Sequence, residues 1–294
     1  MADRTNEATR RISRRKFLRR SVLGTLGAGI AATGYTRFLE PWWVEQSHVR
    51  VAVANLPDAL AGLRIAHLTD IHYQSCSLDE VADWVAMTNA RSPDFVCMTG
   101  DSISGHPKWA GELTGALAEL AAPLGVVACL GNHDYGRAFP ADDPDHRAVG
   151  RQTRRLLEAA GIEVLVDQVT TRHVNGTPLQ IAGVGEFWSD DYDPTLVRRA
   201  DHRPLIVLAH NPDVFCELDP SAFDLMLAGH THGGQVKLPL IGAITLPINH
   251  RELAEGLHER DGARLYVSRG IGYGYPVRFL CRPELPILEL VRAG

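Results

Sequence analysis

The stretch Leu63-Arg-Ile-Ala-His-Leu-Thr-Asp-Ile-His72 decides the fold that we expect for this chain. An apolar run typical of a buried β-strand, 63–68, ends just before two side chains of metal-ligand type, Asp70 and His72. Four later segments repeat this arrangement of an apolar run followed by carboxylate, amide or imidazole groups. They carry Asp101, then Asn132 and His133, then His210, and finally His230 and His232. Oxygen and nitrogen ligands with almost no sulfur indicate hard or borderline divalent cations.

The spacing of the first three segments indicates parallel strands joined by helices. Asp70, Asp101 and Asn132 follow one another at intervals of 31 residues, about the length of a strand-helix-strand unit. The intervening segments, 78–90 and 111–121, have apolar residues at helical spacing and end near prolines. Because open α/β sheets bind ligands beyond the carboxyl ends of parallel strands, we expect these three loops to lie side by side.

The second half of the chain supplies a further set of apolar runs. They cover 179–184, 205–209, 225–228, 265–268 and 287–291, and two of them lead into His210 and into His230 and His232. These strands suffice for two sheets packed face to face with helices outside. Cys97 and Cys129 lie in predicted strands as small packing residues, and His67 is expected in the interior.

Taken in order, the motifs DIH (70–72), GD (100–101), GNHD (131–134), the lone His210 and GHTH (229–232) resemble those of the calcineurin-like metallophosphoesterases. The resemblance covers roughly residues 48–294. It implies an α/β fold, a four-layer αββα sandwich with two central mixed sheets and metal-binding loops at strand ends. It also implies two divalent metal ions, which can be manganese, iron or zinc.

The same resemblance assigns roles to the individual residues. One metal ion would be held by Asp70, His72 and His232, and the other by Asn132, His210 and His230, with Asp101 bridging the two. His133 matches the catalytic histidine that stabilises or protonates the leaving-group oxygen. Asp134 is a candidate for orienting its surroundings.

The chemistry can also be argued from the residues. Two neighbouring cations lower the pKa of a bridging water from about 15.7 towards about 7, so that a bridging hydroxide can attack a phosphoryl group. The chain has no GxSxG motif and no cysteine in a reactive-thiol motif, and this mechanism needs no side-chain nucleophile. We therefore predict a two-metal phosphoesterase that hydrolyses phosphodiester, pyrophosphate or lipid-linked phosphate substrates. Two alternatives are a catalytically silent metal-binding envelope protein and a nuclease-type phosphodiesterase.

The charge distribution disfavours the nuclease. Residues 1–20 carry a net charge of +6, which leaves −11 on residues 21–294. Proteins that bind nucleic acid present basic grooves to the phosphates, and the body of this chain is acidic. Nucleic acid is therefore not an expected partner.

The amino terminus predicts export. Arg14 and Arg15 precede a Phe-Leu pair and a moderately apolar run, 22–32, which resembles a twin-arginine signal. We expect residues 1–40 to form this signal or an N-terminal anchor and residues 41–294 to form the phosphoesterase domain. The partners would be the export machinery and a membrane surface. The location would be the outer face of the cytoplasmic membrane, the periplasm or the cell wall, as in the branch of the family with membrane-associated phosphodiesterases and UDP-diacylglucosamine hydrolases. The alternative is a basic tail that binds nucleic acid or anionic lipid.

The segment 236–248, VKLPLIGAITLPI, is unusually apolar for a stretch next to the GHTH motif. Two interpretations are open. The first, which we favour, is a buried hairpin that covers a sheet edge. The second is an apolar lip beside the metals that holds the acyl chains of a lipid substrate.

Overall fold

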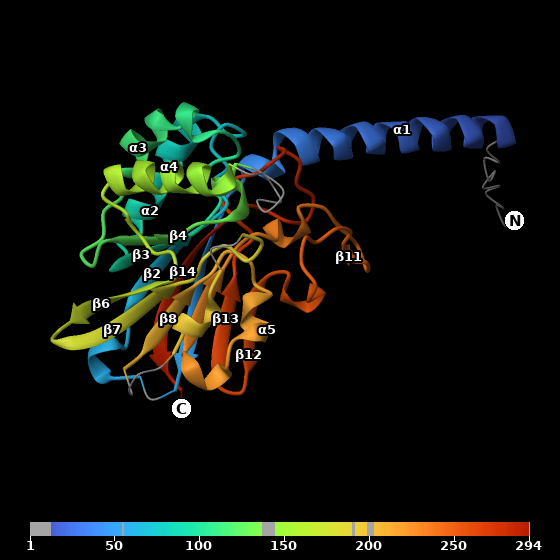
Figure 1. Cartoon of the computed structure of the whole chain (residues 1–294). Helices are drawn as coiled ribbons and strands as arrows, with labels where there is room; N and C mark the ends of the chain where they lie inside the picture. The colour runs from blue at the N-terminus through green and yellow to red at the C-terminus, as the bar shows by residue number, and fades with distance from the viewer. Residues whose placement is uncertain (1–12, 55, 137–144, 190–191, 199–202, 294) are drawn as a thin grey trace, which may run out of the picture.

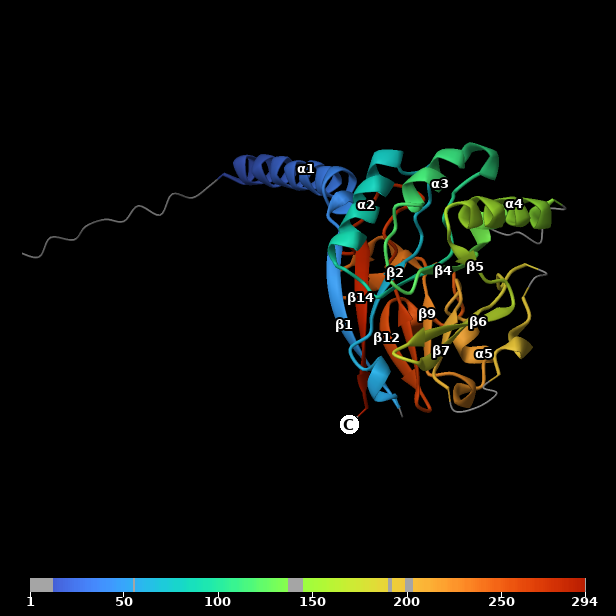
Figure 2. The same ribbon diagram turned by 90° about the vertical axis from the view of Figure 1, so that its left-hand side faces the viewer.

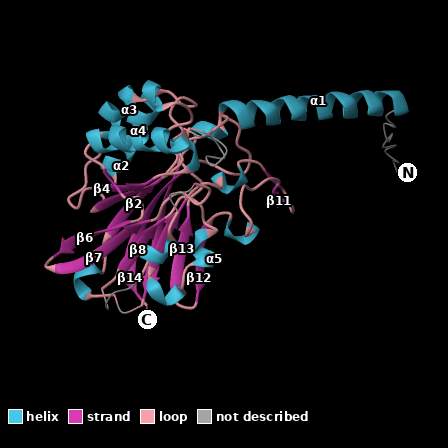
Figure 3. Cartoon of the chain, in the orientation of Figure 1, coloured by secondary structure: helices cyan, strands magenta, loops and turns pink. Residues whose placement is uncertain are grey.

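The computed structural model of the chain describes residues 13–54, 56–136, 145–189, 192–198 and 203–293 (Figure 1). Residues 1–12 of the predicted signal segment lie outside this set. The described part contains two six-stranded sheets, a separate two-stranded sheet, and helices around them. In Figure 3 the strands are gathered in the middle of the body, with α2, α3 and α4 on one side of them.

The first sheet has the strand order β1-β14-β2-β3-β4-β5. Its strands are β1 (Glu45–Val53), β14 (Glu284–Arg292), β2 (Arg64–Leu68), β3 (Phe95–Thr99), β4 (Val126–Cys129) and β5 (Glu163–Val164). Strand β14 runs antiparallel to β2, whereas β2, β3, β4 and β5 are parallel, so the sheet is mixed. The carboxyl ends of β2, β3 and β4 therefore lie at one edge, as the spacing predicts.

Three helices cover the outer face of this sheet: α2 (Leu78–Ala90), α3 (Gly111–Leu117) and α4 (His146–Ala159). A capping box starts α2, because the Ser77 hydroxyl accepts from the Glu80 amide at 3.3 Å and the Glu80 carboxylate accepts from the Ser77 amide at 2.8 Å. Trp84 of α2 and Leu157 of α4 are buried against the sheet. The helix predicted over 111–121 ends earlier, at Leu117. The backbone hydrogen bonds that follow it span three residues instead of four, so the α-helix does not continue.

The second sheet has the order β12-β13-β9-β8-β7-β6. Its strands are β12 (Gly256–Arg260), β13 (Ala263–Val267), β9 (Leu225–Ala228), β8 (Leu205–Leu208), β7 (Thr177–Gly183) and β6 (Gln168–Val174). The outer pairs are antiparallel and the inner ones parallel, so this sheet is also mixed. The short helix α5 (Val214–Glu217) packs on its outer face through Phe215. The apolar cluster between the sheets includes Phe95, Cys97 and Cys129 from one sheet and Ile206 and Leu227 from the other. The predicted fold of two packed mixed sheets between helices is confirmed.

The amino-terminal helix α1 (Arg14–Phe38) extends away from the body, as Figures 1 and 2 show from two directions. None of its residues is buried, and a short 3-10 turn, Glu40–Trp42, joins it to β1. Among the described residues, no helix combines the length and apolar character that crossing a membrane requires. The 3-10 turn is anchored to the body, because Glu40 is fully buried and accepts a hydrogen bond from the Cys281 amide.

The favoured interpretation of the segment 236–248 is wrong. The segment forms a two-stranded sheet of its own, β10 (Lys237–Leu238) and β11 (Gly242–Ala243), which joins neither large sheet. The apolar side chains around its turn are exposed: Leu240 is fully exposed, and Ile241 and Ile244 are 72% and 56% exposed, whereas Ile248 is partly buried against the core. The side chains around the turn are not buried, although the apolar composition suggests that they would be, because the hairpin pairs with itself instead of covering a sheet edge. We refer to residues 236–248 as the apolar hairpin.

One histidine between the sheets gives the protein an acid-sensitive stability. His67 is fully buried, its Nε2 lies 2.8 Å from the Thr99 hydroxyl, and burial lowers its pKa to about 3. In the unfolded chain its pKa is about 6.5, so below that pH the unfolded state binds a proton that the folded state excludes. The stabilising effect of the neutral ring is present above about pH 6.5 and is lost as the pH falls towards about 3.

Between about pH 7.5 and about pH 5, we expect the free energy of unfolding of the wild type to fall by about 2 kcal/mol more than that of the His67→Gln variant, because glutamine does not titrate. The measurement is urea unfolding of chelator-treated wild type and variant at both pH values. The other buried imidazoles contribute equally to both proteins, so the difference between the two pH dependences isolates residue 67. Identical pH dependences would contradict this explanation.

Candidate metal centre

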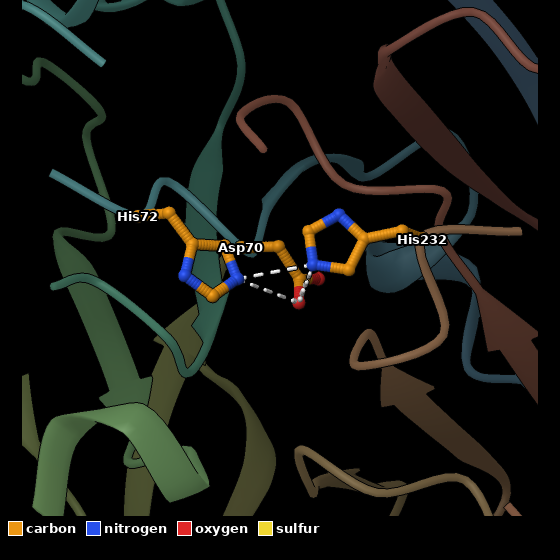
Figure 4. A group of neighbouring side chains, drawn as sticks. All are labelled: Asp70, His72 and His232. Carbon is orange, nitrogen blue, oxygen red and sulfur yellow. Dashed lines mark hydrogen bonds and ion pairs between the residues drawn. The ribbon is translucent and has the colours of Figure 1, made fainter. Parts of the chain in front are cut away.

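The loop after β2 and the loop after β9 bring three side chains together, as Figure 4 shows. The Nε2 atom of His232 lies 3.3 Å from Asp70 Oδ1 and 3.0 Å from Nε2 of His72. All three side chains are buried or nearly so. The predicted ligands of the first metal ion therefore lie within reach of one cation, although they are about 160 residues apart in the sequence.

A second group lies beside the first and combines Asp101, His210 and His230. The Nε2 atom of His210 lies 3.2 Å from Asp101 Oδ2, 3.1 Å from Nδ1 of His230 and 3.1 Å from Oδ1 of Asn132. These four residues are buried. The predicted ligands of the second metal ion thus also converge on one point.

The carboxylate of Asp101 connects the two groups. Its Oδ2 atom lies 3.2 Å from His210 Nε2 and 3.5 Å from His72 Nε2, while Oδ1 accepts a hydrogen bond from the His133 amide at 2.8 Å. A single carboxylate oxygen therefore faces a ligand from each group. This is the position that the bridging role predicted for Asp101 requires.

Hydrogen bonds at the far side of each ring determine which nitrogen faces the centre. His210 Nδ1 lies 2.7 Å from the Thr99 carbonyl, and His230 Nε2 lies 3.0 Å from the Pro247 carbonyl. A carbonyl only accepts, so each of these nitrogens donates its proton, and in the neutral, metal-binding form of the ring the opposite nitrogen has its lone pair towards the centre. His72 Nδ1 lies 2.9 Å from the Ser104 hydroxyl, an arrangement compatible with the same orientation.

The donor set suits a divalent cation. In the second group, three acceptors surround Nε2 of His210 at 3.1–3.2 Å: the carboxylate of Asp101, the amide oxygen of Asn132 and Nδ1 of His230. Acceptors this close together need a positive charge among them, which either a proton on His210 or a bound cation supplies. Imidazole nitrogens with carboxylate and amide oxygens suit borderline first-row divalent ions.

Backbone geometry aims these side chains. Asp70, His72, Asp101, His230 and His232 all adopt left-handed conformations, with φ between 49° and 70°. Such conformations are unfavourable for residues with a β-carbon, at a cost of about 1 kcal/mol or more each, and they cluster at functional sites. Five of the seven predicted ligands are therefore held in strained backbone that the surrounding structure must stabilise.

The glycines of the motifs allow this close packing. A β-carbon at position 131 would lie 2.4 Å from Asp101 Oδ1, and one at position 229 would lie 2.4 Å from Asp70 Oδ2. Gly131 and Gly229 are therefore required because the ligand carboxylates pass directly over their α-carbons.

The buried charges are consistent with ligand chemistry. Burial lowers the pKa of His72 to about 4 and that of His230 to about 3, so both rings are neutral near pH 7, the form that binds metals. Burial alone would lower the pKa of His210, but the charge of Asp101 and its hydrogen bond raise that pKa to about 10. The electrostatics around Asp101 therefore favour a positive charge at the point where its carboxylate meets His210.

His133 is placed differently from the ligands. Its ring centre lies 4.9 Å from that of His72, it groups with His72 and Asp101, and it is only partly buried. Its position at the rim leaves the ring accessible to a bound molecule. The neighbouring Asp134 is fully buried, and its carboxylate accepts from the amides of Ser102 and Gly131, both at 2.9 Å. Asp134 thus joins the loops after β3 and β4, the orienting role predicted for it.

Three residues near the centre were missed at the sequence level. Glu186, just after β7, is buried, and burial raises its pKa to about 7. Its Oε2 atom accepts from the Trp188 amide at 2.8 Å, and the Trp188 ring packs edge-on against His230 at 4.7 Å between centres. Arg278 is fully buried and donates to the carbonyls of Arg269 and Gly272. Only Glu186 had a detectable signal, because it follows a predicted strand.

The fold and this cluster define a metal-dependent hydrolase of phosphate esters, and the sequence comparisons agree. The chain belongs to the calcineurin-like phosphoesterase family, whose profile matches residues 63–234. Phosphodiesterase YaeI of Escherichia coli is 33% identical over 95% of this chain and 100% of that protein. The uncharacterized metallophosphoesterase YkuE of Bacillus subtilis is 30% identical over 96% of this chain and 98% of its own length. UDP-2,3-diacylglucosamine pyrophosphatase LpxG of Chlamydia muridarum is 29% identical over 78% of this chain and 84% of that protein.

Proposed function

We propose that the chain is a two-metal phosphoesterase for phosphodiester, pyrophosphate or lipid-linked phosphate substrates. The observation that carries the proposal is the Asp101 carboxylate, which faces His72 in one ligand group and His210 in the other at 3.5 and 3.2 Å. Such a shared carboxylate suits two adjacent ions. The names of the similar proteins, a phosphodiesterase and a pyrophosphatase of a lipid-linked nucleotide, support these substrate classes.

Different residues of the site would have different roles in the reaction. Two bound ions would lower the pKa of water and neutralise phosphoryl oxygens. Asp70, His72 and His232 would hold one ion, Asn132, His210 and His230 the other, and Asp101 both. His133, at the accessible rim, would donate a hydrogen bond or a proton to the departing oxygen.

We also propose that the protein is exported by the twin-arginine route and acts on the outer side of the cytoplasmic membrane. The sequence supports this through Arg14 and Arg15, which precede the apolar run 22–32. In the structure these arginines lie in the first turn of α1, and the helix leaves the body without burying any residue. A test is to replace both arginines with lysine and to follow the location of the protein in cells; retention in the cytoplasm is expected.

The activity is tested with the full chain and bis(p-nitrophenyl) phosphate. We expect chelation to abolish hydrolysis and added Mn²⁺ to restore it, because the acceptor groups need cations to position and activate water. Nucleotide-linked pyrophosphates, a phospholipid and duplex DNA form the substrate panel, with DNA the poorest because the body is acidic. Full metal occupancy without hydrolysis of any of these substrates would replace the proposal by a silent metal-binding protein.

A further inference from the structure

Three segments that carry exposed apolar side chains lie on the side of the body from which α1 extends (Figure 1). One is the end of α1 with the turn that follows it, one is the loop after the GIGYG stretch, and one is the apolar hairpin. We define the apolar face by six side chains: Trp43, Leu240, Ile241, Ile244, Tyr275 and Leu280. Their exposed fractions run from 52% to complete exposure.

Backbone contacts make these segments neighbours. The amide of Lys237 in the hairpin donates to the Phe279 carbonyl at 2.9 Å, and the amide of Arg278 donates to the Thr36 carbonyl of α1 at 3.1 Å. The Arg282 guanidinium donates to the Trp43 carbonyl at 2.9 Å and lies 4.1 Å from the centre of its ring. The loop 275–282 therefore connects the end of α1 to the apolar hairpin.

The composition of the apolar face suits a bilayer surface. Large apolar patches on soluble proteins mark interaction sites, and Trp and Tyr favour the membrane interface, where the ring is apolar and the polar group is hydrated. Cations border the face: Arg37 lies 5.4 Å from the Phe38 ring, and Arg251 donates to the Ala243 carbonyl of the hairpin.

The apolar face is joined directly to the metal centre. The hairpin follows His230 and His232 in the chain, and its carbonyl at Pro247 accepts from His230 Nε2 at 3.0 Å. On the other side, the guanidinium of Arg278 lies 3.5 Å from Nδ1 of His232. The segments that carry the exposed side chains are thus the same segments that hold two predicted ligands.

We propose that the apolar face is a membrane-docking surface that inserts shallowly into a lipid bilayer and holds the metal centre at the level of the lipid headgroups. Docking itself requires no turnover, but its use in presenting a phospholipid or lipid-linked phosphate to the metals rests on the proposed function. The hairpin tip, with Leu240 and Ile241, would enter the acyl region, and Tyr275 and Trp43 would lie at the interface.

The test uses the full chain with vesicles of phosphatidylcholine, with and without phosphatidylglycerol. Hydrogen exchange should slow on vesicle addition in peptides covering 236–248 and 273–282, but not in a peptide from β6. This readout reports on the hairpin whether or not α1 also binds the vesicles. Unchanged exchange in the hairpin of vesicle-bound protein would overturn the proposal. Protection that appears without lipid and rises with protein concentration would also overturn it, in favour of contact with a second copy of the chain.

A matched pair of variants tests whether docking promotes the hydrolysis of a lipid substrate. The double variant Leu240→Asp with Ile241→Asp should lower the hydrolysis of a phospholipid in vesicles by about ten-fold and leave the soluble phosphodiester unaffected. The control, Val169→Asp with Leu196→Asp, changes two exposed apolar side chains outside the face, at 48% and 44% exposure, and should match wild type on both substrates. Equal lipid hydrolysis by both variants would refute docking while the phosphoesterase activity stands. Vesicle protection without turnover of either substrate would refute the activity and leave docking standing.

Discussion

Asp101→Asn is expected to lower the hydrolysis of a soluble phosphodiester by about a thousand-fold or more, because the change removes the negative charge common to both ligand groups. Asparagine keeps the size of the side chain and an oxygen to accept from the His133 amide. It also tolerates the left-handed backbone at this position, where φ is 51°. The loss would therefore report on charge and ligand chemistry rather than on shape.

The measurement combines initial rates with the metal content of the purified protein, which should fall from two ions per chain to one or none. Asp261→Asn is a matched control: Asp261 is exposed, lies in the turn between β12 and β13, and has nearly the same backbone conformation, with φ of 49°. The control should retain wild-type rate and metal content. An Asp101→Asn protein that keeps two ions and more than a tenth of the activity would show that the carboxylate does not bridge.

The ligands could be predicted because each follows a strand. Strands such as β2, β3 and β4 are recognisable from short apolar runs, and parallel pairing brings their carboxyl ends to one edge. The residue types after those runs are few and chemically specific. Sequence position and side-chain type together therefore sufficed to name Asp70, Asp101 and the other residues that the structure brings together.

The groups that orient the ligands could not be predicted in this way. The partners of His210 and His230 are the backbone carbonyls of Thr99 and Pro247, and a carbonyl carries no sequence signal. The left-handed conformations of Asp70 and His232 are equally hidden, because these residue types are not the glycines that normally mark such backbone. Both features arise only when distant loops meet.

The apolar hairpin shows a different limit of sequence analysis. Apolar composition usually indicates burial, and on that basis a covered sheet edge was the better prediction for 236–248. The structure leaves Leu240 and Ile241 in solvent, because the two strands of the hairpin are only two residues long, with Pro239 in the turn between them and Pro247 after them, too short to pair with a large sheet. Composition alone does not distinguish a residue buried by the protein from one that a membrane would bury.

A substitution of His133 distinguishes metal binding from proton delivery. We expect His133→Gln to retain both ions, because the seven predicted ligands are other residues and His133, although within ligand distance of His72 and Asp101, is only partly buried. Hydrolysis of a diester with an alkyl leaving group should fall by about 10²- to 10³-fold, in the range for loss of a general acid. A control substitution, His173→Gln, changes an exposed histidine on β6 and should have no effect.

The leaving group identifies the role of the ring. A p-nitrophenolate ion departs without a proton, so the His133→Gln protein should lose much less activity on a p-nitrophenyl diester than on an alkyl diester. A purely structural effect would lower both rates by the same factor, since metal positions and substrate contacts are shared by the two reactions. Equal losses on the two substrates, or loss of bound metal, would therefore remove His133 from proton delivery and place it among the groups that only support the centre.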